Sequence, residues 1–113
     1  MASGRLAAVE PSATTNTSLY IPPTDKVATC TVNVNNRAAA TRTIRVAIVD
    51  GAVGDIADAD YILYERTLNA NGDSDQLETL QITGIVLSDA DRIVIRASGV
   101  DVSFVVWGFE EAE

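Results

Sequence analysis

Aspartates recur as closely spaced pairs in the candidate loops of this chain. The pairs are Asp58 with Asp60, Asp73 with Asp75, and Asp89 with Asp91. Two carboxylates in one loop could hold a hard cation such as Ca²⁺, and two carboxyls about 5 to 9 Å apart could act as acid and base in glycoside hydrolysis. Asp is also common in turns because its side chain accepts hydrogen bonds from nearby backbone amides. Since the spacing does not match the known calcium loop and a polar turn does not raise a carboxyl pKa, we expect no metal ligands and no catalytic residues here.

The residue types that usually carry catalysis are scarce. The chain has no His and a single Cys, Cys30. It therefore lacks the usual general base near neutral pH, the usual partner of a nucleophile and the commonest transition-metal ligand. Cys30 alternates with Ala28 and Val32, which is typical of a small buried residue, and a lone Cys fits synthesis in a reducing cytoplasm. We expect no enzymatic activity and no cofactor.

Aromatic side chains offer a different chemistry, the stacking of sugar rings. Tyr61, Tyr64 and Trp107 could form such a platform, which would make the chain a carbohydrate-binding module. Aromatic residues are only 5% of the chain. Packing is therefore the simpler role for these three side chains.

Arginines form the last group of candidate binding residues. Arg45, Arg92 and Arg96 fall on the non-core faces of their expected strands. One interpretation is cross-strand pairing with Glu65 or Glu78. The other is contact with the acidic surface of a neighbouring molecule, because Arg binds carboxylates in a bidentate geometry.

These residues must be positioned by β-strands, because alternation of apolar and polar residues dominates the chain. Strands are predicted at residues 26–36, 41–49, 60–68, 76–87, 92–98 and 102–109, with room for one helical turn in 54–59. Gly, Asn and Asp turn signals separate them at intervals of about ten residues. The pattern predicts an all-β fold, a single antiparallel β-sandwich that is Ig-like or jelly-roll-like.

A chain of 113 residues has the size of one domain. Residues 1–18 are mostly small and polar, so we expect them to form an extended N-terminal arm that neighbouring molecules hold in place. Residues 19–113 then form the β-sandwich domain.

The last predicted strand is apolar on both faces. Val102, Phe104 and Val106 point one way and can fill the core. The opposite face carries the side chains of Val105, Trp107 and Phe109. We expect this second face to be an interface, covered by another chain or by the N-terminal arm of one.

The charge of the chain restricts its partners. Eight basic residues stand against sixteen acidic ones, which gives a formal net charge of −8. An acidic surface repels phosphates, so we expect neither nucleic acid nor an anionic membrane as a partner. No segment approaches the roughly 20 apolar residues of a membrane-spanning helix, and the N-terminus shows no signal peptide.

Short turn and strand motifs follow one another in a distinctive order along residues 19–110. They are Leu19-Tyr20-Ile21-Pro22, Asn35-Asn36-Arg37, Thr43-Ile44-Arg45-Val46-Ala47-Ile48, Asp60-Tyr61-Ile62-Leu63-Tyr64-Glu65, Leu68-Asn69-Ala70-Asn71-Gly72, Arg92-Ile93-Val94-Ile95-Arg96-Ala97-Ser98 and Val105-Val106-Trp107-Gly108-Phe109-Glu110. This order of motifs is similar to that of a group of small tailed-bacteriophage virion proteins. The similarity consists of turn and strand patterns without catalytic residues.

The resemblance implies a non-enzymatic virion component made in the host cytoplasm. It is either a head decoration (cement) protein on the outer capsid surface or a small tail-, neck- or fibre-associated protein. Its implied partners are further copies of itself and the major capsid protein or another virion protein. A trimer fits the three-fold positions of a capsid, while dimers and a tail ring stay open. The competing class is a carbohydrate- or calcium-binding β-sandwich module.

Overall fold

The computed structural model describes residues 3–71 and 79–112 and confirms the predicted all-β sandwich. Two short 3₁₀ turns, η1 (Val53–Asp55) and η2 (Asp58–Asp60), fall where a helical turn was allowed. The strands of the described residues are β1 (Ser3–Val9), β2 (Thr17–Tyr20), β3 (Lys26–Asn36), β4 (Arg42–Asp50), β5 (Tyr61–Leu68), β6 (Thr79–Leu87), β7 (Asp91–Ala97) and β8 (Val102–Ala112).

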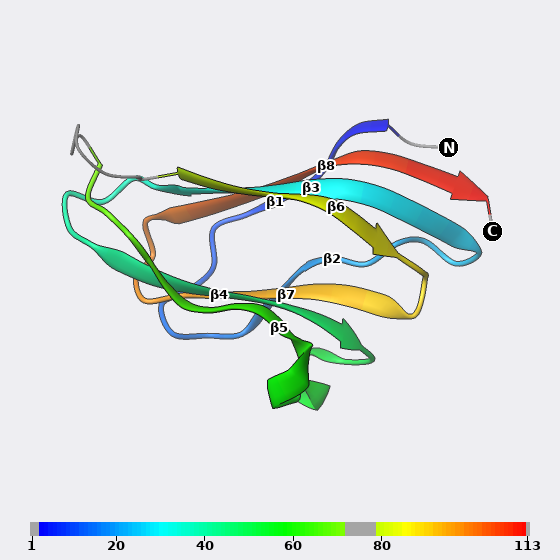
Figure 1. Ribbon diagram of the computed structural model, residues 1–113, viewed down its shortest axis with the longest axis horizontal. Helices are drawn as coiled ribbons and strands as arrows, with labels where there is room; N and C mark the ends of the chain where they lie inside the picture. Colours follow the sequence, from blue (N-terminus) through cyan, green and yellow to red (C-terminus); the bar gives the residue numbers. More distant parts are fainter. Residues whose placement is uncertain (1–2, 72–78, 113) are drawn as a thin grey trace.

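The described strands form two antiparallel sheets that face each other as two layers (Figure 1). One sheet has the order β1-β8-β3-β6 and is called the β8 sheet below. The other, with the order β2-β7-β4-β5, is called the β7 sheet. The pairs β1–β8, β2–β7, β3–β6 and β4–β5 are those of one long antiparallel hairpin rolled into a sandwich, which is the jelly-roll arrangement and not the Ig-like one.

The core lies between the two sheets and follows the predicted alternation. Val102, Phe104 and Val106 of β8 are fully buried, and Phe104 is the largest of the fully buried side chains. From the opposite sheet, inward-facing residues such as Ile44 and Ile95 join the same cluster. The alternating pattern therefore placed the core side of these strands correctly.

The extended N-terminal arm is not confirmed. Residues 3–9 form β1, which pairs with β8 along its length. Leu6, Ala7 and Val9 pack against the main core. β2, whose first two residues fall within the expected arm, pairs with β7. β1 and β2 have too few large apolar residues to show clear alternation in the sequence. Their pairing with β8 and β7 nevertheless holds them in the two sheets.

The four edge strands all carry irregularities, whereas the central pairs do not. Both β3–β8 and β4–β7 run without a register shift. The edge strands are interrupted between Arg5 and Ala7 in β1, Ser18 and Tyr20 in β2, Leu63 and Arg66 in β5, and Ile82 and Ile85 in β6. Such bulges twist an edge and hinder pairing with a strand of another molecule.

A second, smaller hydrophobic cluster lies on the outer side of the β7 sheet, where η1 and η2 cover it (Figure 1). Its buried members are Ala47, Val49 and Val94. Tyr61 and Ile56 pack against them from the η segment and the start of β5. In the described part of the chain, no helix is long and apolar enough to cross a membrane.

Candidate functional site

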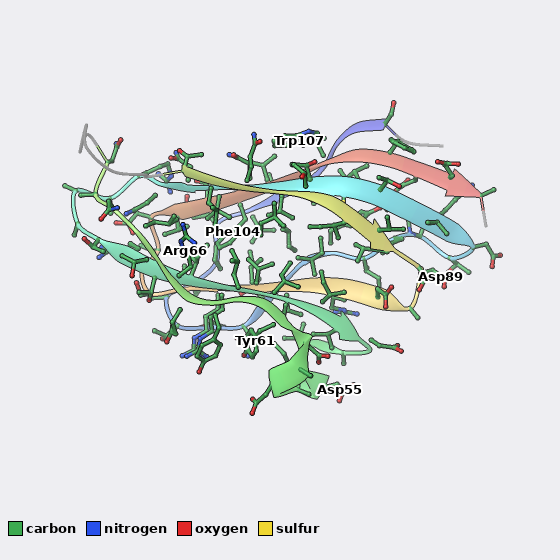
Figure 2. All side chains as sticks on the ribbon, viewed as in Figure 1. Asp55, Tyr61, Arg66, Asp89, Phe104 and Trp107 are labelled. Carbon is green, nitrogen blue, oxygen red and sulfur yellow. The ribbon has the colours of Figure 1, made fainter. Side chains whose placement is uncertain are left out.

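The six predicted interface residues lie on opposite sides of the sandwich. Figure 2 shows Trp107 on the outside of one sheet, Phe104 between the sheets and Tyr61 on the outside of the other sheet. The residues on the outer side of the β8 sheet are Val105, Trp107 and Phe109, and those on the outer side of the β7 sheet are Arg45, Arg92 and Arg96. The two groups therefore cannot form one continuous site, nor can the two tyrosines and Trp107 form one sugar platform.

The outer side of the β8 sheet carries rows of uncharged side chains along the described residues of β3 and β6 and along β8 as far as Phe109. Charged side chains border these rows: Arg5 of β1 is paired with Trp107, Arg37 donates to Ser103, and Glu111 is paired with Val27. Residues that are paired in an antiparallel sheet point to the same face, so the register identifies these rows. We call this surface the neutral face, and its members are Thr29, Thr31, Asn33, Asn35, Thr79, Gln81, Val86, Ser103, Val105, Trp107 and Phe109.

An apolar ridge runs along the neutral face. Trp107 is 37% exposed and Phe109 40% exposed, and Val86 across the sheet is more exposed still. In the register, Thr31 lies beside Trp107 and Thr29 lies between Phe109 and Val86. Depletion of charge together with exposed aromatic rings is typical of the core of a protein interface.

The outer side of the β7 sheet brings two of the three arginines together. Arg45 and Arg96 are directly opposite each other in the β4–β7 register. An Nη atom of Arg45 donates to Glu65 Oε1 at 2.8 Å, and the same guanidinium lies 4.5 Å from the centre of the Tyr64 ring. The predicted cross-strand pairing of Arg45 with Glu65 is thus confirmed, whereas Glu78 lies outside the described residues.

A bulge in β5 makes this arrangement possible. Tyr64 and Glu65 together oppose the single residue Arg45, and Glu65 has a left-handed backbone with φ of 51°. A bulge re-aims side chains, and here it turns both toward the same arginine. The hydrogen bond to Glu65 raises the pKa of Arg45, and the same bond lowers the pKa of Glu65 with a further contribution from the charge of Arg96.

A small hollow of about 80 Å³ lies at this pair of arginines. We call it the arginine hollow, and its lining residues are Thr14, Thr43, Arg45, Glu65, Arg96, Ala97 and Ser98. No hydrogen bond or ion pair joins the Arg96 guanidinium to another described residue, and the buried Nε of Arg45 also lacks a partner there. Arg92 is four residues, or about 13 Å, along β7 from Arg96 and does not line the hollow.

A second, more open hollow of about 480 Å³ is linked to it by the contact between Tyr64, which lines the second hollow, and Arg45, which lines the first. Asp58, Tyr61 and Tyr64 line this tyrosine hollow. The two rings meet edge to face with their centres 4.9 Å apart. Sequence reasoning named both tyrosines, but it missed their proximity to Arg45 because the bulge that creates it has no clear sequence signal.

The aspartates of the predicted pairs mostly bind backbone amides. Asp60 Oδ2 accepts from the amide of Ala57, and Asp91 Oδ2 accepts from that of Ser88. Asp89 accepts from the amide of Asp25. Within residues 3–71 and 79–112, no cluster of three or more potential metal-ligating side chains is present, and the pair Asp73 with Asp75 lies outside those ranges.

Comparison with known proteins gives no further assignment. The chain matches no protein-family model, no curated protein and no solved structure. Its function has to be inferred from its two outer faces.

Proposed function

We propose that this chain is a non-enzymatic structural protein that self-associates through the neutral face. More specifically, we propose that it is a decoration protein on the outer surface of a bacteriophage capsid. The observation that carries the proposal is the neutral face itself, a patch of uncharged side chains bordered by Arg5 and Glu111, which exposes Trp107 and Phe109 on a chain with a net charge of −8.

Charge favours the neutral face as the contact between copies. Two chains of net charge −8 repel each other wherever acidic surfaces meet. The neutral face carries uncharged side chains, and the bordering Arg5 and Glu111 have opposite signs. Two copies can therefore approach there without bringing acidic surfaces together, and they remove the rings of Trp107 and Phe109 from water. A buried Trp at the centre of an interface is a frequent hot spot.

Geometry also favours face contact over edge contact. The bulged edges of both sheets hinder strand addition. At about 3.3 Å per residue and about 4.8 Å between strands, the β8 sheet, whose strands have 7, 11, 11 and 9 residues, covers roughly 600 Å². A stable interface buries about 800 Å² per partner, so the whole face is close to the required size.

Placement on a capsid is supported by three considerations. The motifs resemble those of small tailed-phage virion proteins, and jelly rolls are common in viral capsid and lectin domains. The acidic charge disfavours contact with packaged nucleic acid and so favours the outer surface. Since a fold alone does not determine function, the placement needs its own experiment.

Sedimentation velocity on the full chain tests self-association. We expect the wild type to form an oligomer and Trp107→Ser to be a folded monomer by circular dichroism, because the substitution removes the central ring of the neutral face. Tyr64→Ser is the matched control, since Tyr64 is an exposed ring on the opposite face. A monomeric wild type, or an oligomer that survives in Trp107→Ser, would refute the proposal.

The location on the virion is tested with purified particles. We expect mass spectrometry to detect the chain in virions from the source that encodes it, and antibody labelling to place it on the head. Labelling of the tail would support the tail-associated alternative. Absence of the chain from the particles would refute both.

A further inference from the structure

We propose that the arginine hollow and the tyrosine hollow together bind an acidic sugar, a pyranose that carries one carboxylate. The carboxylate would lie against Arg45 and Arg96, and the sugar ring would lie against Tyr64. This site is on the face opposite the neutral face. It therefore does not rest on the proposed self-association.

The balance of charge at the arginine hollow calls for one further negative charge. Arg45 and Arg96 are directly opposite each other, and like charges in that position destabilise a sheet. Glu65 compensates one of the two positive charges. A monoanion would make the hollow neutral, whereas a phosphate dianion would leave an excess of negative charge beside Glu65.

The donors of the hollow match a carboxylate. Arg96 has no hydrogen-bond partner among the described residues. The Nε of Arg45 is buried and has none either, whereas buried donors are usually satisfied. Arg can bind a carboxylate with two parallel hydrogen bonds. Thr43 and Ser98 line the same hollow, whose volume of about 80 Å³ suits a group of a few heavy atoms.

The tyrosine hollow supplies the contacts that a sugar ring needs. Tyr64 is 61% exposed, and Tyr61 supports it edge to face. The hollow of about 480 Å³ falls within the range of about 300 to 1,000 Å³ that is usual for small-molecule sites. Asp58 lines it and can accept hydrogen bonds from hydroxyl groups.

The surroundings favour a sugar over an acidic peptide. An acidic peptide carries several negative charges, and Asp58 and Glu65 flank the two hollows with carboxylates that would repel them. A sugar with a single carboxylate meets the arginines with that group. Its hydroxyl groups can donate hydrogen bonds to the carboxylate of Asp58, so the contact with Asp58 is favourable.

Ligand-observed NMR and calorimetric titration of the full chain test the proposal with glucuronate and N-acetylneuraminate as probes, and with glucose, acetate and inorganic phosphate as comparisons. We expect a Kd near about 1 mM for at least one acidic sugar, and binding at least roughly tenfold weaker for all three comparisons. Equal binding of acetate and the acidic sugars would overturn the sugar assignment. So would stronger binding of phosphate, or no binding of either acidic sugar at about 20 mM.

Variants locate the site. Arg96→Gln and Tyr64→Ala should each weaken binding of the acidic sugar at least roughly tenfold while circular dichroism shows a folded chain. Arg96→Lys keeps the positive charge but loses the planar guanidinium that can bind a carboxylate with two hydrogen bonds, so it should retain only part of the affinity. This variant is a second test if Arg96→Gln does not fold. Arg66→Gln, on β5 outside both hollows, is the matched control and should bind like the wild type. Unchanged binding in folded Arg96→Gln and Tyr64→Ala would refute the site.

Discussion

Three ionisable side chains meet inside the core at one end of the sandwich. The hydroxyl of Tyr20 donates to Glu110 Oε2 at 2.5 Å, and both residues are buried. Cys30 belongs to the same hydrophobic cluster as Tyr20 and makes a small contribution to the raised pKa of Tyr20. Burial and the nearby carboxylate raise the pKa of Tyr20, and burial raises the pKa of Cys30 to about 11. The fold therefore holds both groups in their neutral forms.

Stability should fall at alkaline pH, partly because of Cys30. A raised pKa means that the neutral thiol is favoured in the folded state, so its contribution is complete below the unfolded pKa of about 9 and is lost between about pH 9 and 11. By pH 10 the expected loss is about 1.4 kcal/mol, equivalent to one pKa unit. Urea denaturation at pH 8 and pH 10 should show this loss in the wild type, and a smaller one in Cys30→Ala. Equal losses in the two proteins would contradict the prediction.

The sequence predicted the contacts of individual residues only where the residues are neighbours in one sheet. Alternation placed Cys30 in the core, where it is 3% exposed, and it suggested the pair of Arg45 with Glu65. It gave no hint of the bond between Tyr20 and Glu110. These residues are 90 positions apart in the sequence. They meet because β2 and β8 lie in the two sheets that face each other across the core.

At the scale of elements, β8 depends on a glycine at its centre. Gly108 has φ of 152°, and a Cβ atom there would lie 2.0 Å from the carbonyl oxygen of Thr29 on β3. Gly108→Ala should therefore destabilise the protein by about 3 kcal/mol or more, because the clash is with backbone that cannot move aside. Gly54→Ala is the control, since no atom lies within 4 Å of its added Cβ.

Chemical denaturation of the two variants checks this prediction. The midpoint of Gly54→Ala should stay within about 0.5 kcal/mol of the wild type, as for ordinary surface changes. A stability of Gly108→Ala equal to that of Gly54→Ala would show that β3 and β8 are not as close as described. The prediction concerns folding alone, because Gly108 lines neither hollow.

The sequence predicted the strands better than it predicted their order. Alternation identified β3 with its exact bounds and β8 from its first residue. It does not decide which strands pair, and the consecutive strands β3 and β4 lie in different sheets. β1 escaped prediction because its register shifts between Arg5 and Ala7, which breaks the period of two. Strand order and register shifts depend on pairing with strands that are distant in the sequence.

At the scale of the whole molecule, the two sheets present different chemistries to the outside. The neutral face offers apolar rings among uncharged side chains, and the arginine hollow offers a local positive charge on an acidic chain. Because the two surfaces are on opposite sides (Figure 2), copies that join through the neutral face leave the arginine and tyrosine hollows open. Self-association and ligand binding are therefore compatible in one particle, and each can be removed by substitutions that spare the other.

The role of β1 gives the last prediction. Deleting residues 1–9 should destabilise the isolated domain, because β1 pairs with β8 and places Leu6 and Val9 against the core. The loss of a few kcal/mol should lower the melting temperature by at least about 10 °C for a domain of this size.

The deletion should also promote aggregation, since it turns β8, which is regular in its pairing with β3, into an unprotected edge. Replacing Leu6 and Val9 together by Ser serves as a control, because it keeps the strand and removes only apolar contacts. This variant should lose stability without gaining the tendency to aggregate. An unchanged melting temperature after deletion, measured by calorimetry with light scattering to monitor aggregation, would instead support an arm that is ordered only by neighbouring molecules.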